Sequence, residues 1–148
     1  MTAFLLSVHV LAAIVTVGPV AVAASMFPPA ARAAPAATVR VLHRVTRVYA
    51  VIGILVPVFG LATGAALGVL GDAWLIVSMV LTAGAAAVLV GLVLPAQRRT
   101  LTALDVGEAI PDGIGRRLAM HTGVFNVLWA VVVVLMIYRP GSTTGVGP

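Results

Sequence analysis

Apolar residues gather in four long stretches of this chain, and charged residues are confined to the segments between them. The stretches cover about residues 3–26, 48–70, 73–94 and 118–138. Each is long enough to cross a hydrocarbon core of about 30 Å as a helix that rises ~1.5 Å per residue. The pattern therefore predicts an all-α integral membrane protein with four transmembrane helices, forming a single domain over residues 1–148.

Prolines mark the end of the first stretch. Pro28, Pro29 and Pro35 are expected to break the helix, because proline has no backbone N–H and its ring clashes with the preceding turn. Residues 27–47 are therefore expected to form a loop. A secretory signal peptide is the alternative for the first stretch, since Ala21–Ser25 resembles a cleavage site. The stretch lacks a basic start and is too long for that alternative.

The connections between the remaining stretches are short. Gly71 and Asp72 predict a tight turn in which Asp72 caps the following helix. Pro95 is expected to end the third helix, so that residues 95–117 form the second long loop. Such connections favour a four-helix up-down-up-down bundle, in which helices adjacent in sequence run antiparallel.

The distribution of arginine predicts the orientation in the membrane. The chain has nine basic residues, all arginine, against four acidic ones, and eight of the nine lie in residues 27–47 and 95–117. Because basic loops stay in the cytoplasm, both segments are predicted to be cytoplasmic and both termini outside, in a bacterial cytoplasmic (inner) membrane. The arginines flank apolar stretches, so the expected surroundings are a lipid bilayer, and nucleic acid is not an expected partner.

Composition supports this class and removes several kinds of chemistry. Apolar residues make up 61% of the chain and charged residues 9%, with a mean hydropathy of +1.18, which no soluble globular domain has. The chain has no cysteine, so disulfides, thiolate metal sites and thiol catalysis are excluded. Abundant Ala, Val and Gly, with arginine in place of lysine, is typical of a GC-rich genome, for example an actinobacterial one.

Small residues recur every three or four positions in two predicted helices. The second helix carries the stripe Gly53, Pro57, Gly60, Gly64 and Gly68, and the third carries the row Ala83, Ala87 and Gly91. Close approach through small residues drives helix packing in lipid, so we expect the two rows to pack together. Pro57 also predicts a kink, because the carbonyl of Gly53 loses its helical donor. Chance spacing and the docking of a helix from another protein are the alternatives.

Histidines raise the question of a cofactor. His43 and His121 lie in the same predicted leaflet, and paired histidines on facing helices can ligate haem b. Their expected depths differ by roughly 12 Å at ~1.5 Å per residue, which favours interfacial histidines bonded to a carbonyl or a lipid headgroup. His9 lies near the outer face, too far from the other two to pair with either.

The other polar residues of the predicted helices are few. Side chains expected to make hydrogen bonds between helices are those of Thr16, Ser78, Thr82, Thr122 and Asn126. Trp74 stands where an interfacial aromatic residue belongs. Trp129 is near the middle of the fourth helix, and we expect it to face protein so that its indole N–H can find a partner.

Motifs that would indicate catalysis or transport do not occur. The sequence has no Gly-x-Ser-x-Gly, no His-x-x-x-His, no phosphate-cradling loop and no carboxylate beside a histidine. We therefore expect no catalytic residue, no metal site and no cofactor, with haem b as the alternative. A transporter would want a carboxylate or histidine near mid-membrane, and none is present.

The order of several short motifs resembles a family of small bacterial predicted integral membrane proteins, domain of unknown function 2269-like. They are an opening His9-Val10-Leu11 followed by Gly18, a basic entry to the second helix, Thr63-Gly64, the exit from Pro95 to Arg99, and the closing segment Met136 to Pro140. Two departures are Thr16-Val17-Gly18 where Trp-Gly is expected, and Arg139 where lysine is expected. The resemblance implies the membrane architecture and leaves the function open.

Together these observations predict a non-catalytic membrane subunit or assembly factor that packs against other integral membrane subunits of a larger complex, for instance an actinobacterial respiratory chain. A bundle that binds haem b for electron transfer is the alternative, and a small permease or channel is the second alternative.

Overall fold

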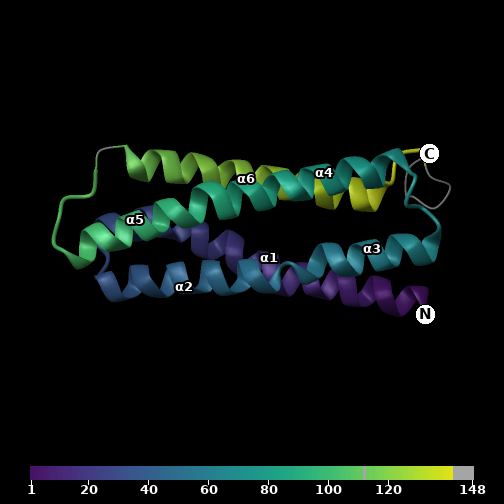
Figure 1. Cartoon of the computed structure of the whole chain (residues 1–148), viewed down its shortest axis with the longest axis horizontal. Helices are drawn as coiled ribbons and strands as arrows, with labels where there is room; N and C mark the ends of the chain where they lie inside the picture. Colours follow the sequence, from purple (N-terminus) through teal and green to yellow (C-terminus); the bar gives the residue numbers. More distant parts are fainter. Residues whose placement is uncertain (112, 142–148) are drawn as a thin grey trace.

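The computed structural model describes residues 1–111 and 113–141, and every regular element in them is helical. The elements in chain order are α1 (Thr2–Ala33), α2 (Ala36–Ile52), α3 (Leu55–Leu67), α4 (Ala73–Val88), the π-helix η1 (Leu89–Val93), α5 (Leu94–Asp105) and α6 (Ile114–Tyr138). They combine into four helices long and apolar enough to cross a membrane, Thr2–Ala33, Ala36–Leu67, Ala73–Asp105 and Ile114–Tyr138. The protein is a four-helix membrane bundle, as predicted (Figure 1).

The first predicted loop is mostly helical, and the expectation that its prolines break the helix was wrong for two of them. Pro28 and Pro29 lie inside α1, and only Ala34 and Pro35 separate α1 from α2. Phe27 and Pro28 are buried in the bundle. Packing of Phe27 and Pro28 therefore offsets the backbone hydrogen bond that Pro28 cannot make, whereas Pro29 lies on the exposed side of the helix.

Pro95 does not end the third helix either. The helix passes through the π-turn η1, where the Leu94 N–H bonds to the Leu89 carbonyl five residues earlier. Pro95 then stands at the start of α5, where a missing N–H costs little. Single π-turns of this kind insert one extra residue into a helix. The second predicted loop is therefore helical up to Asp105.

The kink expected in the second helix is present. α2 ends at Ile52 and α3 begins at Leu55, so the chain leaves the α-helix one turn before Pro57. Pro57 has no N–H to donate to the Gly53 carbonyl. This carbonyl instead accepts the Val56 N–H at 3.0 Å. The helix is therefore tightened locally and its backbone group stays satisfied.

The bundle has two distinct ends in Figure 1. The N-terminus, the turn between α3 and α4, and the end of α6 lie at one end, which we call the terminal end. The connections between α1 and α2 and between α5 and α6 lie at the other, which we call the arginine end. The buried apolar core runs from the middle of the bundle toward the arginine end and consists of Val20, Ala24, Phe27, Val39, Ala85, Leu89, Val93, Leu101, Leu118 and Phe125.

Helix pairing differs between the two ends. α1 packs along α2, α3 and α6, and α4 packs mainly along α6, whereas α3 and α4 contact each other only sparsely. At the terminal end the bundle therefore consists of two pairs, α1 with α3 and α4 with α6. At the arginine end α5 closes the bundle against α2.

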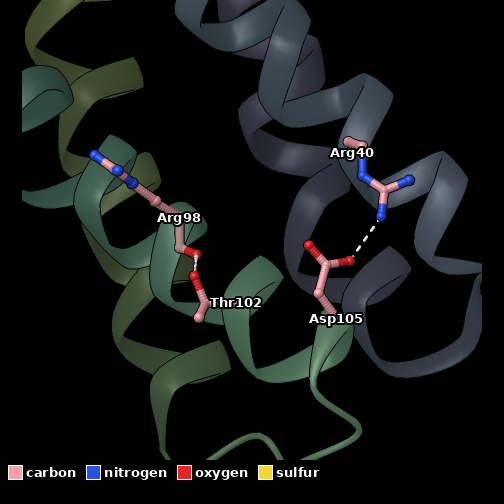
Figure 2. Close-up of polar contacts among 4 residues, drawn as sticks. All are labelled: Arg40, Arg98, Thr102 and Asp105. Carbon is pink, nitrogen blue, oxygen red and sulfur yellow. Dashed lines mark hydrogen bonds and ion pairs between the residues drawn. The ribbon is translucent and has the colours of Figure 1, made fainter.

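One ion pair joins α2 to α5 at the arginine end. Arg40 Nη2 donates to Asp105 Oδ1 at 2.6 Å, with 58% and 50% of the two side chains exposed. Figure 2 shows the Arg98 side chain turned away from this pair, while the Arg98 carbonyl accepts the Thr102 hydroxyl on the same helix. Pairs this exposed contribute little to stability, typically about 0–1 kcal/mol.

Candidate functional site

The separation of the helix pairs leaves a cavity of about 720 Å³ at the terminal end. α1 and α3 line one side of it, and α4 and α6 line the other. Its lining is mostly Leu, Val, Ile, Met and Ala side chains, with four residues that carry polar groups: His9, Thr82, Trp129 and Arg139. An apolar cavity with a few polar groups is the usual form of a small-molecule site.

His9 is held in one orientation by α3. Its Nδ1 lies 2.9 Å from the Val56 carbonyl oxygen, one turn after the kink. The ring also lies against Gly60, where an added Cβ would be 2.9 Å from the His9 Cε1. Glycine at position 60 therefore lets the imidazole approach the α3 backbone. The hydrogen bond between His9 and Val56, which are 47 residues apart, joins α1 to α3.

The hydrogen bond of His9 also defines which nitrogen carries the proton. A carbonyl oxygen only accepts, so Nδ1 must donate. In the neutral ring Nε2 is then an acceptor. Nε2 makes no hydrogen bond with residues 1–111 or 113–141. His9 lines the cavity, and in the neutral ring its Nε2 keeps a free lone pair.

Two further polar residues line the cavity on the opposite side. The Thr82 hydroxyl donates to the Ser78 carbonyl of its own helix at 2.7 Å. Trp129 is half-buried, and its indole N–H has no hydrogen-bond partner in the described part of the chain. The expectation that Trp129 faces protein and finds a partner is therefore only half met, because it faces the cavity.

Trp74 does not line the cavity but contacts Arg139, which does. Its indole N–H donates to Asp72 Oδ2 at 3.0 Å, and the Arg139 guanidinium lies 5.5 Å from its ring centre. Asp72 is the N-cap residue of α4, as predicted, but its side chain makes no capping bond and binds Trp74 instead. Trp74 is only 5% exposed, so it is a packed residue rather than a lipid-facing one. The cation–π contact fixes α6 to α4 at the terminal end.

The small-residue stripe of the second helix has several different roles. Gly60 and Gly64 are packing positions, because Cβ atoms there would meet His9 and Leu75 at 2.9 and 3.0 Å. Gly53 belongs to the kink, and Pro57 is exposed and lines the cavity.

Gly68 does not pack against a helix but ends α3. Its φ of 70° is left-handed, and Val69 N–H bonds back to the Gly64 carbonyl at 3.0 Å. This is the Schellman arrangement, in which glycine is favoured because a Cβ would be strained.

The row on the third helix does not pack against the second as expected. Ala83, Ala87 and Gly91 are all exposed, because α4 packs on α6 and meets α3 closely only near their turn. An added Cβ at Gly91 would meet no atom within 4 Å. A further row with the same spacing, Gly115, Ala119 and Gly123 on α6, was not among the predicted positions.

His43 and His121 lie toward the arginine end and line neither the 720 Å³ cavity nor a smaller one of about 410 Å³ beside Arg32 and Arg116. His43 Nδ1 donates to Gln97 Oε1 at 3.0 Å, and Gln97 is completely buried. The haem b alternative therefore gains no observation from the geometry and stays a prediction. No group of three His, Asp or Glu side chains that could hold a metal occurs within the described residues.

Several buried polar atoms near these histidines have no partner within the described residues. They are Gln97 Nε2, His121 Nδ1, Thr122 Oγ1 and Asn126 Oδ1. Buried groups of this kind are commonly satisfied by ordered water.

Hydrogen bonding between the helices is rarer than predicted. Thr16, Ser78 and Thr82 each donate to the carbonyl four residues earlier in their own helix. Asn126 meets the expectation, because its Nδ2 donates to the Ser25 hydroxyl of α1 at 3.2 Å. Hydroxyl groups in helices often bond back to the preceding turn, which satisfies them without a neighbour.

The chain belongs to the family described as predicted integral membrane protein (DUF2269), which matches residues 3–140. No curated protein and no solved structure gives a match. The family agrees with the resemblance drawn from the sequence and with the four membrane-spanning helices.

Proposed function

We propose that this member of the predicted integral membrane protein family is a non-catalytic accessory subunit or assembly factor of a larger membrane complex. In this proposal a helix of the partner subunit docks along the α4 face formed by Ala83, Ala87 and Gly91. The exposure of this small-residue row is the observation that supports the proposal.

Physical chemistry favours a helix as the occupant of this face. Lipid chains gain nothing from small residues in particular, whereas a second helix can bring its backbone close along a small-x-x-x-small row. No atom lies within 4 Å of a Cβ at Gly91, although Ala83 at the other end of the row lines the 720 Å³ cavity. The α4 row also lies near the middle of the 73–105 helix. The other small-residue row, Gly115, Ala119 and Gly123, begins beside Arg116 and Arg117.

The arrangement in the membrane is part of the same proposal. The basic residues at the arginine end favour placing that end in the cytoplasm, with both termini outside a bacterial inner membrane. A partner in a respiratory complex is the form of the proposal that we would test first, because small accessory helices are common components of large membrane assemblies.

The experiment is purification from the native membrane in mild detergent, followed by mass spectrometry of the fixed components and an absorption spectrum of the same sample. The key variant is Ala87→Leu, and the control is Ala130→Leu, an exposed alanine of α6 flanked by Asn126 and Val134 at four-residue spacing. We expect a stoichiometric partner that survives in the control and is lost in Ala87→Leu.

Three results would contradict the proposal. One is a partner retained equally in both variants, and another is loss of self-association alone, which would make the row a homodimer face. The third is a Soret band that disappears on His43 or His121 substitution, which would identify the haem b alternative.

A further inference from the structure

We propose that the cavity between α1/α3 and α4/α6 binds a bilayer-soluble molecule with an apolar body and a hydroxyl group, and that this hydroxyl donates to Nε2 of His9. The proposal goes beyond the accessory role. Of the docking row only Ala83 lines the cavity, whereas Ala87, the residue changed in the docking test, and Gly91 lie outside it.

The polarity of the ligand follows from the His9 hydrogen bond. Nδ1 lies 2.9 Å from the Val56 carbonyl and therefore carries the ring proton, so the neutral imidazole offers only a lone pair at Nε2. A carbonyl or ester oxygen brings a second lone pair and gains nothing there. A hydroxyl group brings the missing proton, so it is the group that the site selects.

The apolar body follows from the size and lining of the cavity. Its volume of about 720 Å³ falls in the usual range of ligand cavities, roughly 300–1,000 Å³, and its walls are mainly aliphatic. The helices that line it belong to four segments long and apolar enough to cross a membrane, so a molecule that dissolves in the bilayer is the class of ligand that fits. The Trp129 indole N–H, also on the wall, offers a donor to a second oxygen.

The proposal differs from a purely structural role for His9. The bond from Nδ1 to Val56 and the contact with Gly60 already hold α1 against α3. A structural role uses only Nδ1, whereas the proposal requires Nε2. An asparagine at position 9 can place its amide N–H near the position of Nδ1 and lacks a counterpart of Nε2, so it separates the two roles.

The probe is the pair 2-decyl-1,4-hydroquinone and 2-decyl-1,4-benzoquinone, which share a body and differ in the hydroxyl groups. The full chain is placed in lipid nanodiscs without oxygen, and binding is followed by quenching of tryptophan emission, since Trp129 lines the cavity. The variants are His9→Asn, Ala86→Phe to fill the cavity from α4, and Ala130→Phe as a matched control outside it. Competition with dioctanoylglycerol and its 3-acetyl ester distinguishes a lipid alcohol from a quinol as the natural source.

The hydroquinone should bind about five-fold more tightly than the quinone, as one net hydrogen bond of about 1 kcal/mol implies. His9→Asn should remove this preference, Ala86→Phe should abolish binding of both molecules, and Ala130→Phe should change neither. Equal affinities in the native chain, or a preference that survives His9→Asn, would overturn the proposal. A Soret band in the native protein that is lost in His9→Asn would also overturn it, because the cavity would then hold a haem.

Discussion

The contact between His9 and Gly60 can be measured as a coupling energy. Adding a Cβ at position 60 in the native chain places it 2.9 Å from Cε1 and 3.3 Å from Nδ1 of His9, so the ring must move. Movement of the ring stretches the 2.9 Å hydrogen bond to Val56, worth about 1 kcal/mol, and adds about 1 kcal/mol of rotamer strain. Glycine to alanine inside a helix gains about 1 kcal/mol. Gly60→Ala should therefore destabilise the native chain by about 1 kcal/mol.

Removal of the imidazole reverses the sign of this effect. In a His9→Ala background nothing opposes the new methyl group, so Gly60→Ala should stabilise the chain by about 1 kcal/mol. The double-mutant cycle then gives a coupling energy of about 2 kcal/mol. Free energies of unfolding for the four proteins can be compared by reversible titration with a denaturing detergent in mixed micelles. If Gly60→Ala has the same effect in both backgrounds, His9 does not rest on Gly60 and the reasoning fails.

Two other predictions concern the turn and the ion pair. Gly68→Ala should lower the free energy of unfolding by about 1–2 kcal/mol, because φ is 70° at this position. The control Gly84→Ala lies inside α4 with no atom within 4 Å of its Cβ, so it should be neutral or stabilising. An equal effect of both substitutions in the same titration would contradict the capping role of Gly68. Asp105→Asn should lower the free energy of unfolding by less than about 1 kcal/mol, and added salt should weaken this effect, because the partner Arg40 is half exposed. A larger loss of stability that is insensitive to salt would mean that the ion pair is better shielded from water than its exposure indicates.

Prolines show where local rules and tertiary structure disagreed. The sequence correctly predicts the kink before Pro57. Pro57 has no N–H for the Gly53 carbonyl, and the backbone tightens so that the Val56 N–H binds this carbonyl instead. The same rule failed at Pro28, where burial beside Phe27 outweighs the lost hydrogen bonds, and at Pro95, where a π-turn absorbs the irregularity. Burial of a proline depends on helices distant in sequence, so no local signal distinguishes these cases.

The candidate site was only partly accessible to sequence reasoning. The sequence places His9 near the outer face, too far from the other two histidines to pair with either, and does not predict a cavity beside it. Its contact with Val56 joins residues 47 apart, and the cavity beside it exists because α3 packs on α1 while α4 packs on α6. Spacing within a single helix predicts that a face is small or apolar, and it does not predict which neighbour will cover that face.

The sequence by itself determined four membrane helices, their antiparallel order and the turn at Gly71 and Asp72, because an apolar solvent obliges each segment to satisfy its backbone internally. Tertiary structure alone decided the pairing of the helices, the exposure of Ala83, Ala87 and Gly91, and the cavity beside His9. The physical reason is that lipid and helix surfaces are about equally apolar, so hydrophobicity positions each helix in the membrane without choosing its partners. Close contacts such as that of His9 with Gly60 make that choice.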